Sequence, residues 1–248
     1  MTRLRRLLFL SLILMTAATA CASGDETPEV LSQTKIITLQ TTPSLEHWLT
    51  EVADCANGIS DFAIVTQILP TAELDPNLAD LTLRLGDQRE SDPFVALIGV
   101  EQTIILAGRD VPVDSLSLEG LQRVFAGEIR NWNQVPEVVE AGLEINQFTP
   151  TLSYPAGHEL RLLFQSAYLE DRAIAGEPLI FSTEAALEAN LESNPYALAY
   201  TLESLAPEGA KRLTVTEFAA ARSQHKVLAL TPEEPAGKLK QLLLCLQN

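Results

Sequence analysis

Segments with strand and helix patterns alternate along most of this 248-residue chain, and this alternation constrains the fold more than any other feature. Short apolar or alternating runs predict strands at 36–39, 61–69, 79–86, 197–205 and 211–215. Leu81, Leu83 and Leu85 alternate with polar residues, which predicts a half-buried strand. The apolar run 93–108 breaks near Gly99 and predicts two strands or one bent strand.

Helical periodicity fills the intervals between these strands. Ser44 is the predicted N-cap of a helix with the apolar stripe Leu45, Trp48, Leu49, Val52 and Ala56. Ser117 is the predicted cap of a helix at 118–125 that ends at a left-handed Gly127. Further helices are predicted at 158–171, at 182–193 and from Pro235 onward. The sequence therefore predicts an α/β fold with ligands at the C-terminal ends of the strands.

The N-terminus has the three parts of an export signal. Arg3, Arg5 and Arg6 precede the apolar run 7–15, and the small residues 18–20 follow it. The apolar run is too short for a transmembrane helix. We therefore predict a signal peptide at 1–20 and a mature chain that works outside the cytoplasmic membrane, lipid-anchored at its extracytoplasmic face or secreted.

Cys21 follows this signal at the position of a lipoprotein cysteine. Lipidation at Cys21 would anchor the chain in the membrane, and plain secretion after cleavage at the same bond is the alternative. The residues after Cys21 are small, polar and acidic without apolar periodicity, so 21–33 is predicted to be a flexible tether.

The charge of the chain excludes several classes of partner. Subtracting the three arginines of the signal from the 17 basic residues leaves 14, against 33 acidic residues, a net charge of −19. The negative electrostatic field of a chain with this charge disfavours nucleic acid and anionic lipid surfaces as partners. Aligned N–H groups in a local pocket can still bind an anion.

The two remaining cysteines leave one question open. Cys55 lies in the first predicted helix and Cys245 in the last. They could pair in an oxidising compartment if the last helix returns to the first lobe, or they could be two buried thiols.

The stretch Leu118–Trp132 carries the most specific motif of the chain. Leu118, Leu121, Val124, Phe125 and Gly127 are followed by Ile129, Asn131 and Trp132. This Leu-x-x-Val-Phe-x-Gly-x-Ile-x-Asn-Trp pattern resembles the phosphate-type, PstS-like substrate-binding proteins of ABC transporters. The segments 39–49, 78–86, 194–200 and 227–246 resemble the family in the same order. In such a fold Trp132 would fill the second lobe and Asn131 would hold the turn by side-chain hydrogen bonds.

The resemblance implies a two-lobed type II periplasmic-binding-protein-like fold with crossing hinge strands. Lobe 1 would comprise 34–106 and 202–248, and lobe 2 would comprise 107–201. A solute would bind between the lobes, and the closed form would meet an ABC permease. The family holds oxyanions with N–H groups at helix N-termini, one from each lobe.

Candidate ligand-binding residues follow from this correspondence. Thr41, Thr42 and Ser44 match the first anion-binding turn. Asp80 matches a carboxylate that accepts a proton from protonated phosphate, with a solvated Asp at the strand edge as the alternative. In the second lobe the candidates are Tyr154, Gly157, His158 and Arg161.

The second lobe departs from the family's pattern, which has an Arg and then Gly-Ser-Gly-Thr before the helix. Gly157 matches the first Gly, but His158, Glu159 and Leu160 replace the next three residues. Tyr154 or a neighbour occupies the Arg position. Glu159 therefore places a negative charge where an anion needs donors. His158 could restore a positive charge below about pH 6.5.

Two outcomes fit these changes. In the first, the pocket is rebuilt for a different, less anionic small solute, and the identity of that solute, phosphate or another oxyanion included, stays open. Alternatively, the cleft is degenerate and the chain is a sensor or scaffold lipoprotein without a transported ligand. The chain lacks Gly-x-Ser-x-Gly, His-Glu-x-x-His and Cys-x-x-Cys motifs, and His47, His158 and His225 do not have metal-ligand spacing. We therefore predict no enzyme activity, no cofactor and no metal.

Overall fold

The computed structural model describes residues 34–170, 172–175 and 177–248; the predicted export signal, Cys21 and the tether lie outside these residues. The strands are β1 (Lys35–Thr41), β2 (Phe62–Ile68), β3 (Leu81–Leu85), β4 (Phe94–Ala107), β5 (Ser115–Ser117), β6 (Leu152–Ser153), β7 (Leu179–Ile180), β8 (Leu198–Leu202), β9 (Lys211–Thr216) and β10 (Gln224–Thr231). The α-helices are α2 (Trp48–Asn57), α3 (Leu118–Phe125), α4 (Pro136–Glu140), α5 (Glu159–Tyr168), α6 (Glu184–Ser193) and α7 (Gly237–Leu246). The 3-10 turns are η1 (Pro43–Leu45), η2 (Thr71–Glu73), η3 (Trp132–Gln134), η4 (Glu203–Leu205) and η5 (Ala220–Ser223).

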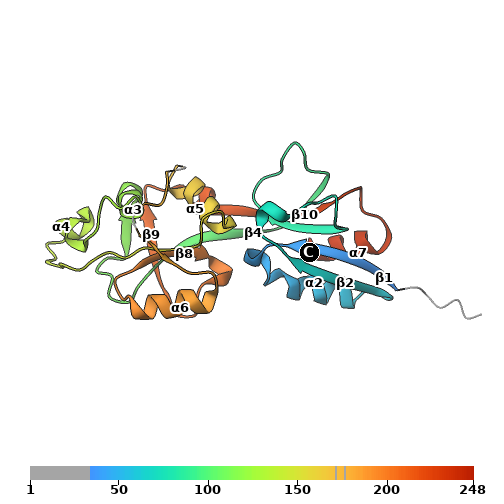
Figure 1. The fold of residues 1–248 in the computed structure, drawn as a ribbon, viewed down its shortest axis with the longest axis horizontal. Helices are drawn as coiled ribbons and strands as arrows, with labels where there is room; N and C mark the ends of the chain where they lie inside the picture. The colour runs from blue at the N-terminus through green and yellow to red at the C-terminus, as the bar shows by residue number, and fades with distance from the viewer. Residues whose placement is uncertain (1–33, 171, 176) are drawn as a thin grey trace, which may run out of the picture. The chain divides into compact units, whose positions relative to one another are not determined.

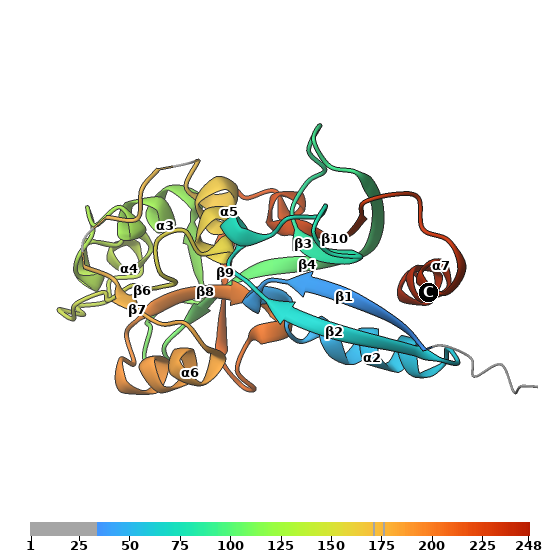
Figure 2. The same cartoon turned by 45° about the vertical axis from the view of Figure 1, so that its right-hand side comes forward.

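The first lobe is built on strands in the order β2-β1-β3-β10-β4 (Figure 1). β1 pairs in parallel with β2 and β3, and β10 runs antiparallel to β3 and β4. Helices α2 and α7 belong to this half (Figure 2). Their residues Val52 and Leu242 are buried in the core. Parallel strands with helices packed on them match the predicted α/β class.

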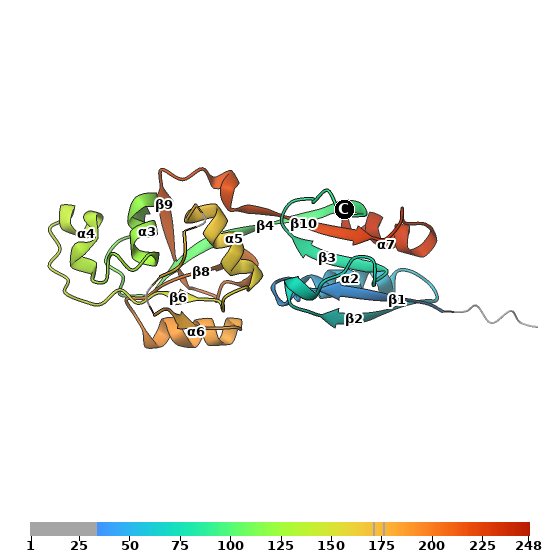
Figure 3. The same cartoon turned by 45° about the horizontal axis from the view of Figure 1, so that its top comes forward.

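Strand β4 is shared by the two lobes (Figure 3). Its pairing with β10 extends to Gln102, and its pairing with β8 begins at the next residue, Thr103. β9 also pairs with the end of β4 and then in parallel with β5. The chain returns to the first lobe through η5 and β10. Two α/β lobes joined by crossing strands are thus present, as predicted. The predicted boundary at residue 202 assigns β9 to the first lobe, although β9 pairs with strands of the second.

The second lobe contains the motif that carried the resemblance. Ser117 Oγ accepts a hydrogen bond from the Gly120 N–H at 3.1 Å, and Gly127 has a φ of +72°, so both predicted ends of α3 are confirmed. Trp132 is completely buried, and its Nε1 donates to the Tyr196 carbonyl at 3.0 Å. The predicted structural role of Trp132 is therefore confirmed.

Two local predictions were wrong. β3 is buried along its whole length, so Thr82 and Arg84 do not face solvent. Ser44 lies inside η1 and is not an N-cap, because α2 begins later, at Trp48 after His47. For the run 93–108, the structure selects the second of the two predicted alternatives. It forms one strand, whose register against β10 shifts near Gly99.

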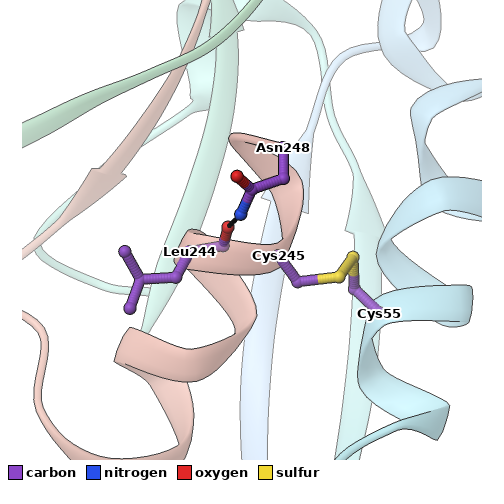
Figure 4. Close-up of a disulfide and its surroundings, with 4 residues drawn as sticks. All are labelled: Cys55, Leu244, Cys245 and Asn248. Carbon is purple, nitrogen blue, oxygen red and sulfur yellow. Dashed lines mark hydrogen bonds between the residues drawn. A yellow bond between two sulfur atoms is a disulfide. The ribbon is translucent and has the colours of Figure 1, made fainter.

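A disulfide joins Cys55 in α2 to Cys245 in α7 (Figure 4). The two Cα atoms lie 5.8 Å apart. The last helix therefore returns to the first lobe, and the question that the sequence left open is answered by a bond across 190 residues of chain.

Candidate interlobe site

The turn after β1 forms the first wall of the candidate site. β1 ends at Thr41, and η1 starts at Pro43, whose ring fixes the backbone for a tight turn. Thr41 and Thr42 are completely buried, and Ser44 is 2% exposed. Because β1 is an inner strand paired in parallel on both sides, this turn lies at the C-terminal edge of the sheet, where α/β folds bind ligands.

The N-terminus of α5 forms the second wall. Gly157 has a φ of +81°, which favours glycine, and His158 is the N-cap. His158 Nδ1 accepts a hydrogen bond from the Leu160 N–H at 3.3 Å. Glu159 is the first residue of the helix, where the helix dipole stabilises a negative charge.

A hydrogen bond joins the two walls. Thr42 Oγ1 donates to Glu159 Oε2 at 2.7 Å, across 117 residues of chain. Glu159 is 5% exposed, and burial raises the pKa of its carboxyl against the opposing effect of the Thr42 hydroxyl and the Leu85 N–H. Ser44 lies close enough to lower this pKa as well, but its Oγ forms no well-oriented hydrogen bond.

Arg84 supplies positive charge behind this contact. It is 4% exposed on β3, its Nη1 donates to the Asp87 carbonyl at 3.0 Å, and its Nη2 pairs with Asp92. Burial lowers the pKa of Arg84, whereas Asp92 and Glu159 raise it, so the guanidinium also stabilises the Glu159 carboxylate. Sequence reasoning missed Arg84 because its place in an alternating strand predicted a solvent-facing side chain.

Two cavities open beside the Thr42–Glu159 contact. The larger has a volume of about 270 Å³ and is lined by Thr42, Pro43, Ser44, Pro70, Thr71 and residues 155–159. The smaller, about 130 Å³, is lined by Pro43, Ser44, Glu46, Tyr154, His158, Leu160, residues 182–184 and Leu205. Ser44 Oγ and Glu159 Oε1 have no hydrogen-bond partner although both are buried. The two walls therefore have unused hydrogen-bonding capacity in residues that line the cavity.

The predicted site residues fall into two groups. Thr42, Ser44, Gly157 and His158 line the larger cavity, and Tyr154 lines the smaller one. Thr41, Asp80 and Arg161 line neither cavity.

Asp80 and Arg161 have partners within the fold. Asp80 Oδ2 accepts from the Thr38 N–H at 2.8 Å and so supports β1. Arg161 Nη1 donates to the Tyr154 carbonyl at 3.2 Å.

The aromatic wall of the smaller cavity is rigid. The Tyr154 hydroxyl lies 2.9 Å from Thr201 Oγ1, and its ring stacks on His158 with centroids 4.3 Å apart. Burial raises the pKa of the Tyr154 hydroxyl. Burial also lowers the pKa of His158, so this ring gains its charge only below the ordinary value of 6.5. The expected positive charge at His158 therefore requires a more acidic medium than the sequence indicated.

Two features are absent from the described residues. Across 34–170, 172–175 and 177–248, no three His, Cys, Asp or Glu side chains cluster as metal ligands would. Within the same ranges, no helix combines the length and apolar character needed to cross a membrane.

The fold and the interlobe position of the site define a type II periplasmic-binding-protein-like architecture, and solved structures share it. An ABC-type phosphate transport receptor from Vibrio cholerae superposes with a TM-score of 0.69 at 16% identity, covering 86% of this chain and 93% of its own. A putative phosphate ABC transporter substrate-binding protein with bound phosphate from Clostridium perfringens gives a TM-score of 0.69 at 15% identity, with 85% and 92% coverage. These likenesses confirm the predicted fold.

Regulatory domains share the fold as well. The CcmR regulatory domain from Synechocystis, in complex with 2-PG, has a TM-score of 0.61 at 10% identity, covering 86% of this chain and 95% of its own. No protein-family model matches the chain, and no curated protein is significantly similar to it in sequence. The same architecture therefore occurs in transport receptors and in regulatory domains.

Proposed function

We propose that this chain is an extracytoplasmic solute-binding protein that holds a small solute between its two lobes. One observation carries the proposal: residues of both lobes line the cavity of about 270 Å³, and two of them, Ser44 and Glu159, each have a buried polar atom without a partner. A pocket that is largely apolar with a few convergent polar groups is the usual form of a small-molecule site.

The chemistry of the lining favours a solute with hydrogen-bond donors. Proline, alanine and glycine residues supply half of the lining residues, and Glu159 supplies an acceptor. A fully ionised phosphate would lie against this carboxylate, and like charges in a buried site repel by several kcal/mol. Uncharged polar solutes or cations with N–H or O–H groups avoid this cost. Phosphate and other oxyanions are therefore the comparison ligands in a binding experiment.

The cellular role follows from the N-terminal sequence and the fold together. An export signal and a lipidated Cys21 would hold the protein at the outer face of the cytoplasmic membrane, and the closed form would deliver its solute to an ABC permease. The phosphate receptors with this fold support such a role. The proposed protein is a binding protein without catalytic activity.

A second function is favoured by the Thr42–Glu159 contact. This hydrogen bond joins the lobes through the chain's own side chains, as a ligand would. A protein closed in this way could act as a sensor or scaffold lipoprotein without a transported solute.

A thermal-shift screen of the purified protein distinguishes the two functions. The panel contains phosphate, sulfate, small polyols, amino acids and amines, each at pH 5.5 and 7.5. A ligand at one hundred times its Kd stabilises the folded state by about 2.7 kcal/mol, which the screen detects. A shift with a neutral or cationic solute supports the solute-binding function. A panel without any shift contradicts it and favours the scaffold role.

A further inference from the structure

Glu159 has the surroundings that a bound oxyanion would have. A carboxylate offers two acceptor oxygens, and this one receives the Thr42 hydroxyl at 2.7 Å and lies at the start of α5. The Leu85 N–H and the Ser44 side chain are close to it. Donors from the first lobe thus converge, at the start of a helix of the second lobe, on a negative group that belongs to the chain itself.

The site is more than a helix N-terminus with an acidic residue. Glu159 and Ser44 are 5% and 2% exposed, both line the same cavity, and each keeps one oxygen without a partner there. Two buried side chains with unused hydrogen-bonding capacity, one from each lobe, indicate space for a ligand beside the carboxylate.

The charged groups around Glu159 come from two elements. Arg84 on β3 is the cation that acts on it, and Asp92 compensates most of that charge by direct pairing. His158 on α5 lines the same cavity and is held neutral by burial. Without the Glu159 carboxylate, the positive charge of Arg84 and the positive end of the α5 dipole would lose a negative group that they stabilise.

We infer that Glu159 is a resident anion of the interlobe site, which excludes free oxyanions and holds the two lobes together. The inference rests on the interlobe site of the proposed function and names Glu159 as the residue that determines its specificity. A shorter, uncharged side chain at this position would expose the Thr42 hydroxyl and the Leu85 N–H of the first lobe at the start of α5. The variant would then accept a tetrahedral oxyanion in the place of the carboxylate.

Two variants and one control test the inference by calorimetric titration with inorganic phosphate at pH 7.5. Glu159→Ser removes the charge and most of the volume, and we expect phosphate to bind at least about tenfold more tightly than to the wild type, since like-charge repulsion is lost. Glu159→Gln removes the charge but keeps the volume, and should not bind phosphate. Glu51→Ser makes the same change at an exposed position of α2 and should resemble the wild type.

Small-angle scattering without ligand tests the second half of the inference. Glu159→Ser and Thr42→Val both remove the contact between the lobes, so both should have a larger radius of gyration than the wild type. Phosphate should restore the compact form in Glu159→Ser only. Thr42→Val leaves α5 intact, so it still provides the test of lobe closure if Glu159→Ser does not fold.

Several outcomes would overturn the inference. One is a folded Glu159→Ser protein that binds no phosphate; another is a wild-type protein that binds phosphate as tightly as this variant. An unchanged radius of gyration in Thr42→Val would remove the closing role. These outcomes differ from failure of the proposed function, in which the wild type ignores the whole solute panel while Glu159→Ser still gains phosphate binding.

Discussion

The Trp48 indole Nε1 donates a hydrogen bond to Glu101 Oε1 at 2.8 Å, next to the point where β4 passes from one lobe to the other. His47 Nε2 lies 2.8 Å from the same oxygen, and Ser204 Oγ donates to Oε2 at 2.7 Å. One buried carboxylate thus connects the start of α2, the crossing strand and η4. This network therefore lies where the chain crosses between the lobes.

Glu101→Gln should destabilise the protein. A carboxylate accepts from all three neighbours, whereas the amide has one acceptor oxygen and presents an NH₂ to the remaining donors. We expect a loss of about 1.5–3 kcal/mol in the free energy of unfolding, measured by urea denaturation at pH 7. Glu203→Gln, which affects an exposed pair with Arg212, should cost less than about 1 kcal/mol.

The pH dependence of stability gives a second test of Glu101. Burial raises the pKa of Glu101, but the hydrogen bonds from His47, Ser204 and Trp48 outweigh it, so the folded pKa lies below 4.5. As the pH falls toward the folded pKa of Glu101, the unfolded state therefore binds more protons than the folded state. The stabilisation is complete above pH 4.5 and is lost as the pH falls through the folded pKa. Glu101→Gln should show a weaker acid dependence than the wild type, and equal slopes would contradict the assignment.

His158 should titrate below its ordinary value. Burial lowers its pKa, so the folded state binds fewer protons than the unfolded state just below pH 6.5. Its contribution to stability is complete above pH 6.5 and declines as the pH falls toward the folded pKa. NMR titration of the His158 ring should give a midpoint below 6.5. His158→Asn keeps a capping side chain and should reduce the dependence of stability on pH between 5 and 6.5.

Reduction of the Cys55–Cys245 disulfide should destabilise the protein strongly. The bond closes a loop of about 190 residues, and chain entropy gives about 5 kcal/mol for such a loop as an upper value. Urea unfolding with and without dithiothreitol measures the difference. The double variant Cys55→Ala/Cys245→Ala should match the reduced wild type and show no response to dithiothreitol; a response would indicate another redox-sensitive group.

Gly99→Ala tests the packing beneath the hinge. A Cβ atom at Gly99 would lie 2.3 Å from Trp48 Cη2, so the indole must move, and Trp48 also holds Glu101. We expect a loss of about 1–3 kcal/mol from overpacking, measured by thermal unfolding. Gly58→Ala is the matched control, because its nearest contact would be the Cys55 carbonyl at 3.5 Å. A Gly99→Ala protein as stable as this control would contradict the packing argument.

The sequence predicted most of the elements because their patterns are local. Ser117 and Gly127 mark the ends of α3 through the hydrogen bonds and backbone angles of a few neighbouring residues. The stretch Leu118–Trp132 predicted the fold. The complete burial of Trp132 agrees with its predicted role of filling the second lobe. The sequence also placed a negative charge at Glu159, next to the residues expected to bind a ligand.

The tertiary structure alone decided what these residues contact. Periodicity assigned Arg84 to solvent, yet it is buried with the Asp87 carbonyl and the Asp92 carboxylate of the loop after β3 as its partners. The partner of Glu159 is Thr42, 117 residues away, and the partner of Cys55 is Cys245. Local patterns record how the chain turns and which face is apolar, whereas contacts between lobes depend on how distant segments meet. The sequence therefore determined the elements and the fold class, and the closed site with its own anion arose only from the folded arrangement.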